Sequence, residues 1–116
     1  MARVNPNLDG PVGSFGLLVD GEKYDGVLDW NIRTADWRCT LTRRSDKASV
    51  LGYARISPGT LLYALPDGSE VHVGGTDPYT VDAFTRGEVW LEWFAYENLV
   101  QIRAAEAPAS PEFKLV

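Results

Sequence analysis

The amino-acid sequence predicts an all-β protein, an antiparallel β-sandwich or partly open barrel of about 7–9 short strands with extended N- and C-terminal arms. Three observations predict this class. Turn signals recur at short intervals, runs rich in β-branched and aromatic residues lie between them, and 116 residues suffice for one hydrophobic core but not two. The turn signals are Asp-Gly at 9–10, 20–21, 25–26 and 67–68, with Pro58-Gly59, Gly74-Gly75 and Arg86-Gly87.

The runs between these turns give the expected strands. Several alternate between apolar and polar residues, which is typical of strands with one buried face. Trp37, Cys39 and Leu41 form one expected inner face, and Leu28, Trp30 and Ile32 form another. The expected strands are 14–19, 26–34, 37–43, 50–56, 60–65, 69–74, 79–84 and 88–96.

The segment TLLYALPDGSEVHV is predicted to be a β-hairpin, with residues 66–69 as its turn. Residues 95–107 fit two structures, because Leu99 and Ile102 suit both a helix face and a strand. We expect a last strand there, with one short C-terminal helix as the alternative. Prolines and glycines in residues 1–14 and prolines in 108–116 indicate two extended arms around one β domain, 15–107. The closing EFKLV is either native or a cloning remnant, and it could hold onto a neighbouring subunit.

Composition excludes several classes of function. A formal net charge of −5 and a pI near 4.7 argue against binding to nucleic acid or to an anionic membrane. No run approaches the roughly 20 apolar residues of a membrane-spanning helix, and the N-terminus lacks the apolar core of a secretion signal. We therefore expect a virion or cytoplasmic protein.

The residues that could carry chemistry favour no catalytic or metal site. His72 is the only histidine and is expected to face outward, with Ser69 and Glu70 pointing elsewhere. Cys39 is expected to be a buried small hydrophobe rather than a nucleophile. The acidic group Asp20, Glu22, Asp25 and Asp29 departs from the spacing of a calcium loop, and Glu88 and Glu92 would lie roughly 13 Å apart on a strand, too far for a glycosidase pair. No cofactor is predicted.

Residues 88–102, EVWLEWFAYENLVQI, raise the question of what they pack against. As a strand they would be apolar on both faces, while a chain of this length usually offers one core. We therefore predict that Trp90, Phe94 and Tyr96, with Glu92, contact a protein partner, through self-association or within a larger assembly. The arms 1–14 and 108–116 would be secondary contacts, laid along an open sheet edge of a neighbour.

Two stretches, 17–41 (LLVDGEKYDGVLDWNIRTADWRCTL) and 57–70 (SPGTLLYALPDGSE), resemble hairpins of small β domains in the tail and baseplate proteins of tailed bacteriophages. The resemblance implies a non-enzymatic virion component that works as a repeated subunit, and it transfers no catalytic residue. Two alternatives stay open. A small acidic inhibitor of a host defence protein would cluster carboxylates on its surface, and a carbohydrate-binding module would expose a flat row of Trp and Tyr.

Overall fold

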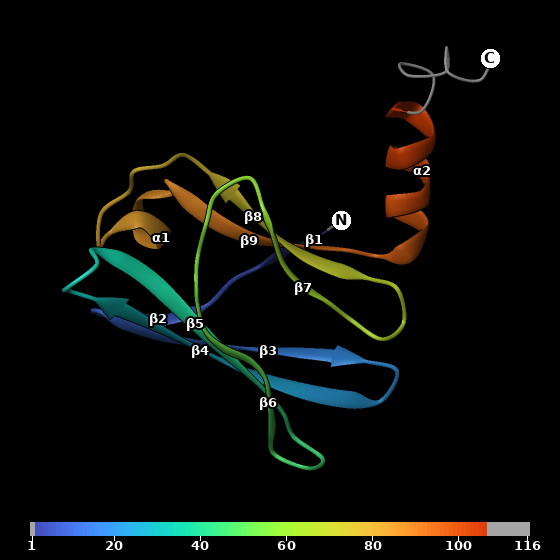
Figure 1. The fold of residues 1–116 in the computed structure, drawn as a ribbon, viewed down its shortest axis with the longest axis horizontal. Coiled ribbons are helices and arrows are strands. Elements are labelled where there is room, and N and C mark those ends of the chain that lie inside the picture. Colours follow the sequence, from blue (N-terminus) through green and yellow to red (C-terminus); the bar gives the residue numbers. More distant parts are fainter. Residues whose placement is uncertain (1, 107–116) are drawn as a thin grey trace.

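The structure, a computed structural model, describes residues 2–106. It contains nine strands and two helices in this part of the chain (Figure 1). In chain order they are β1 (Ala2–Val4), β2 (Asn7–Asp9), β3 (Val12–Val19), β4 (Glu22–Asn31), β5 (Asp36–Arg43), β6 (Ala48–Arg55), β7 (Leu61–Ala64), β8 (Glu70–Gly75), α1 (Ala83–Arg86), β9 (Val89–Phe94) and α2 (Tyr96–Glu106).

The strands form two antiparallel sheets that pack as the layers of a β-sandwich, which confirms the predicted fold class. The four-stranded sheet has the order β1-β9-β8-β7, and the five-stranded sheet has the order β2-β3-β4-β5-β6. One buried cluster lies between them, with side chains from both sheets. Its members are Val19, Tyr24, Leu28, Trp37, Cys39, Leu41, Ile56, Leu65, Val71, Val73, Tyr79, Ala83, Val89 and Leu91.

Strand alternation explains most of this core. Trp37, Cys39 and Leu41 are all buried, as their spacing predicts. Burial raises the pKa of the Cys39 thiol to about 12, which keeps it a neutral, small apolar side chain. Ile32 departs from its expected place and is 84% exposed. Asn31 Oδ1 accepts hydrogen bonds from the backbone N–H groups of the two residues after Ile32, so β4 ends in a turn before Ile32 can face inward.

The predicted hairpin at residues 60–73 is confirmed as β7 and β8. Its loop closes through the backbone, since Leu65 N donates to Ser69 O at 2.8 Å and Gly68 N donates to Leu65 O. Asp67 Oδ1 accepts from both the N–H and the hydroxyl of Ser69, which is the local bonding that favours Asp in tight turns.

The strand predicted at 79–84 is wrong, because this segment turns and ends in the single-turn helix α1. Arg86 N donates to Asp82 O, and Gly87, with φ 74°, caps the turn. Tyr79 is drawn inward instead of alternating, and its hydroxyl donates to Ile56 O at 2.6 Å. A buried tyrosine needs a hydrogen-bond partner for its hydroxyl, and meeting this need outweighs the β propensity of the neighbouring residues, so the segment does not form a strand.

The C-terminal segment is helix α2 rather than the last strand that we favoured. Its first turn forms where Asn98 N and Leu99 N both donate to Ala95 O. Glu97 lies in the first turn and Arg103 in the last, a charge arrangement that complements the helix dipole. Leu99 is buried. Neither of the described helices is long and apolar enough to cross a membrane.

Residues 2–14, expected as an arm, run along both sheets. They form β1 on the edge of the four-stranded sheet, β2 on the edge of the five-stranded sheet and the beginning of β3. The tail 108–116, with EFKLV, lies outside the described residues.

Candidate functional site: the outer face of the four-stranded sheet

Strand β9 separates core residues from surface residues along its length. Val89 and Leu91 are buried, whereas Trp90, Glu92 and Phe94 point to the opposite side and stay partly exposed. Their neighbours on this outer side come from β1, β8 and α2. We call this surface the Trp90 face and define it by Arg3, Glu70, His72, Trp90, Glu92, Phe94 and Arg103.

The indole of Trp90 lies flat over β8 because its partner on that strand is Gly74. A Cβ at position 74 would lie 2.3 Å from the indole, so only glycine leaves room for the ring. The guanidinium of Arg3, from β1, sits 4.2 Å from the centre of the same ring, which is cation–π geometry. Trp90 Nε1 donates to Glu92 Oε1 at 3.3 Å. Trp90 is thus held in one orientation from both sides.

Glu70 organises the other half of the Trp90 face. Its Oε1 lies 2.7 Å from His72 Nε2, and its Oε2 accepts from Arg103 of α2 at 3.0 Å. The hydrogen bond with His72 is the main cause that lowers the pKa of Glu70, and the bond from Arg103 lowers it further. The ring of Phe94 packs beside the imidazole, with centres 4.9 Å apart. The expectation that Glu70 points away from His72 is wrong, because residues two apart on a strand share a face.

Tyr96 lies apart from this row. It is the first residue of α2, is 55% exposed, and packs against Gly68 in the β7–β8 loop. The structure therefore brings together three of the four predicted contact residues, Trp90, Glu92 and Phe94, and places the fourth at the hairpin.

The other candidate residues are dispersed. Cys39 is inside the core while His72 is on an outer face, so the two do not meet. Asp25 pairs with Arg44 at 2.6 Å, and Glu22 accepts from Ser45. Within residues 2–106, no group of three or more His, Cys, Asp or Glu side chains could hold a metal ion.

The tryptophans do not form a flat exposed row. Trp37 is buried, and Trp30 and Trp93 pack against the core cluster. Trp90 carries the Arg3 guanidinium against its ring. A sugar that stacked on Trp90 from that side would have to displace Arg3.

Sequence reasoning missed the charged residues that frame the site. Period-two alternation could have paired Glu70 with His72. The contacts of Arg3 and Arg103 carry no local signal, because each depends on a strand or helix distant in sequence. No protein-family model matches this chain, and no curated protein sequence is significantly similar to it.

Proposed function

We propose that this chain is a non-enzymatic interaction subunit whose Trp90 face docks another subunit of the same assembly. The observation that carries the proposal is the position of Trp90 and Phe94. Both rings lie outside the core, on the side of β9 opposite Val89 and Leu91. Large apolar rings that stay partly exposed on an outer sheet face are typical of contact surfaces.

The composition of the Trp90 face supports protein as the partner. Tryptophan, phenylalanine and arginine are enriched in protein interfaces, and such residues often dominate their binding energy. Arg3 and Arg103 alternate with Glu70 and Glu92, so the surface carries both signs of charge at short range. A nucleic acid or an anionic membrane would instead favour a surface of one positive sign.

The biological setting rests on the resemblance of residues 17–41 and 57–70 to tail and baseplate domains. It suggests a repeated subunit in the virion of a tailed bacteriophage. An acidic inhibitor finds less support, because acidic groups such as Asp25 and Asp46 are each paired with an arginine.

The test compares two double variants by light scattering on a size-exclusion column across concentration. We expect the wild type to form a discrete oligomer, and Trp90→Ser with Phe94→Ser to stay folded but lose mass. The matched control is Val12→Ser with Val27→Ser, which removes two exposed apolar side chains from the outer face of the other sheet. It should leave the mass unchanged.

Three results would contradict this proposal. If the Trp90 and Phe94 variant unfolds, these rings belong to the core. If it folds and keeps the wild-type mass, the Trp90 face is not the contact. A wild type that is monomeric at every concentration would rule out self-association.

A further inference from the structure

Part of strand β3 has no partner strand on one side in the described part of the chain. β2 covers only the first residues of β3, pairing Asn7–Asp9 with Val12–Ser14. Residues 15–19 of β3 pair with β4 on one side and have no strand on the other. Leu18 on this stretch is 67% exposed. We call residues 15–19 the open β3 edge.

The hydrogen-bond pattern identifies the free backbone groups. Trp30 N donates to Pro11 O, so Pro11 faces β4 and its alternate neighbours 13, 15, 17 and 19 do so as well. Arg44 N donates to Lys23 O, so Lys23, the partner of Leu18, turns its carbonyl away from β3. Gly16 and Leu18 therefore direct their N–H and C=O groups toward the open β3 edge.

The other edges are protected in ways that the open β3 edge is not. β6 pairs with β5 through register shifts and contains Tyr53 at φ 48°, β7 has four residues with a register shift, and β1 has three residues. Bulges, short length and charge are the usual means of keeping edges from pairing. β3 pairs with β4 in unbroken register, and SFGLLV carries no charge.

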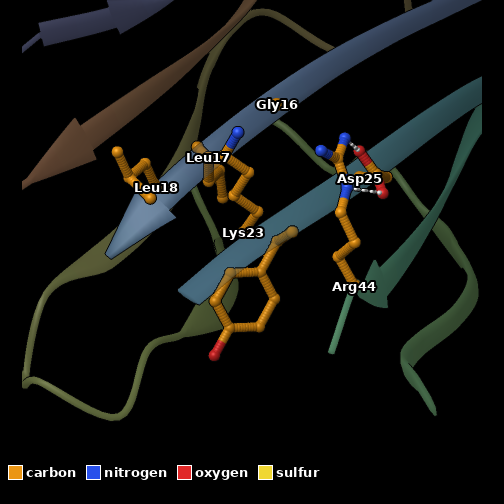
Figure 2. A pocket seen from close by; sticks show the side chains of 7 residues that line it. Gly16, Leu17, Leu18, Lys23, Asp25 and Arg44 are labelled. Atoms are coloured by element: carbon orange, nitrogen blue, oxygen red, sulfur yellow. Dashed lines mark hydrogen bonds and ion pairs between the residues drawn. The ribbon is translucent and has the colours of Figure 1, made fainter. Parts of the chain in front are cut away.

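Both faces beside this edge can receive side chains. On the inner side, Leu17, Val19 and Trp93 line a hollow. On the outer side a second hollow includes Leu18, Lys23 and Asp25, with Arg44 bonded to Asp25 (Figure 2). An added strand would need apolar residues facing inward and polar residues facing outward.

We propose that residues 112–116 (EFKLV) of a second copy of this chain add as a strand to the open β3 edge. In this segment apolar and polar side chains alternate, as a strand between the inner and outer hollows would require. Phe113 and Leu115 would enter the inner hollow beside Leu17, Val19 and Trp93. Glu112 and Lys114 would lie on the outer side near Lys23 and Asp25. The inference rests on the proposed function, an assembling subunit, and gives it a second contact.

The length of the connecting segment favours a second copy over the same chain. α2 rises away from the five-stranded sheet (Figure 1). An 11-residue helix is about 16 Å long, and stacked sheets lie about 10 Å apart. The path back to the chain's own β3 is thus longer than the roughly 20 Å that residues 107–111 can span when fully extended.

The test uses amide hydrogen exchange in the full chain, because Gly16 and Leu18 report on the edge itself. At concentrations where the protein associates, we expect both amides to be protected at least tenfold more than in the dilute protein. The amides of Leu17 and Val19, which face β4, should be protected in both samples and serve as the internal reference. Phe113→Ser with Leu115→Ser should abolish the concentration-dependent protection, while Glu112→Gln with Lys114→Gln should keep it.

A mixing experiment identifies the donor. Leu18→Pro removes an N–H that the fold does not use and blocks the edge, and Leu18→Ser is its control with the N–H retained. The Leu18→Pro protein has a blocked edge but an intact segment 112–116, and the Phe113→Ser, Leu115→Ser protein has the reverse. Adding unlabelled Leu18→Pro protein should therefore restore protection of the Gly16 and Leu18 amides in isotopically labelled Phe113→Ser, Leu115→Ser protein.

The outcomes separate this inference from the proposed function. Trp90→Ser with Phe94→Ser should lower the native mass of the oligomer but keep the protection of the Gly16 and Leu18 amides at high concentration. If one proposal fails, the other can therefore still be tested. Protection that persists in Phe113→Ser, Leu115→Ser without added donor would overturn the donor segment and point to another occupant, such as β3 of a second copy. Gly16 and Leu18 amides that exchange freely at every concentration would overturn the edge contact itself.

Discussion

The outer faces of the two sheets differ in chemistry although their strands share one architecture. On the five-stranded sheet, one row across β3, β4 and β5 is Ser14, Val27 and Thr40. On the four-stranded sheet, a row of three paired residues runs across β1, β9 and β8 and consists of Arg3, Glu92 and His72. Trp90 and Phe94 lie on either side of this row on β9. The first row contains no ring and no charge, whereas the second row with its flanking residues combines rings with charges of both signs.

The two faces also differ in how their carboxylates are held. Asp36, the first residue of β5, forms ion pairs with Arg38 at 2.9 Å and with Arg55 at 3.2 Å, two arginines that lie directly opposite each other on β5 and β6. Its side chain is 5% exposed, while that of Glu70 on the Trp90 face is 15% exposed. Asp36 therefore acts within the fold, and Glu70 remains within reach of a partner.

The largest expected effect separates the two sides of β9. Leu91→Ala should lower the free energy of unfolding by about 2–5 kcal/mol, because it opens a cavity in the core. Trp90→Ser, one residue away, should lower it by no more than about 1–2 kcal/mol, since the ring gives up a cation–π contact and partial burial. Urea unfolding at equilibrium measures both. Equal losses would show that Trp90 is structural and would weaken its assignment to a contact surface.

A smaller difference in unfolding free energy is expected between variants of the two carboxylates, Asp36 and Glu70, and the effect at Asp36 depends on pH. Burial by itself raises the pKa of Asp36, but hydrogen bonds from Arg38 and Thr34 outweigh burial and hold the pKa below its ordinary value. Asp36→Asn should cost about 1–3 kcal/mol at pH 7, because it leaves two opposed arginines without their shared anion. Glu70→Gln should cost less than about 1 kcal/mol.

The sign of the pH dependence follows from the lowered pKa. A carboxylate whose pKa is lower in the folded state stabilises the fold above its unfolded pKa of about 4 and loses this contribution as the pH falls through the folded value. The difference between wild type and Asp36→Asn should thus be constant from pH 7 to pH 5 and shrink at pH 3. A difference that grows as the pH falls would contradict the lowered pKa of Asp36.

The smallest effect is expected at the surface pair of the five-stranded sheet. Asp25 and Arg44 are both about half exposed, and Asp25→Asn should leave the unfolding midpoint unchanged within error at physiological salt. Thermal unfolding followed by circular dichroism is sufficient for this measurement. A clear loss that disappears at high salt would show that this face, too, depends on its charges.

Local chemistry was enough to predict the fold class, most of the strands, the hairpin and the division of β9. The Asp-Gly turns and the alternation of Trp37, Cys39 and Leu41 act within a few residues, so a single sequence contains them. The end of β9 at Phe94 was not predictable in this way. Tyr96 was assigned to the strand, but the helix that begins at that residue is stabilised by its own turn and by the burial of Leu99.

The predicted site was incomplete for a different reason. Trp90 and Phe94 are visible as an apolar excess on one strand, but what holds them comes from distant segments. Arg3 reaches Trp90 through the pairing of β1 with β9, and Arg103 reaches Glu70 from α2. The open β3 edge depends on where β2 stops, which is set by the passage of the chain between the sheets. None of these contacts leaves a periodic pattern in the sequence.

The strand orders also bear on how the chain folds. The five-stranded sheet joins β2 to β6 in sequence order, so each strand pairs with its immediate neighbour in the chain. The four-stranded sheet must bring β1 beside β9, which joins Ala2 to Trp93 across nearly the whole described chain. Short-range pairings close their loops at lower entropic cost and form sooner. During synthesis, the five-stranded meander can therefore assemble while β9 is still being made, whereas β1, which precedes the meander in the chain, must wait for β9 before it can pair.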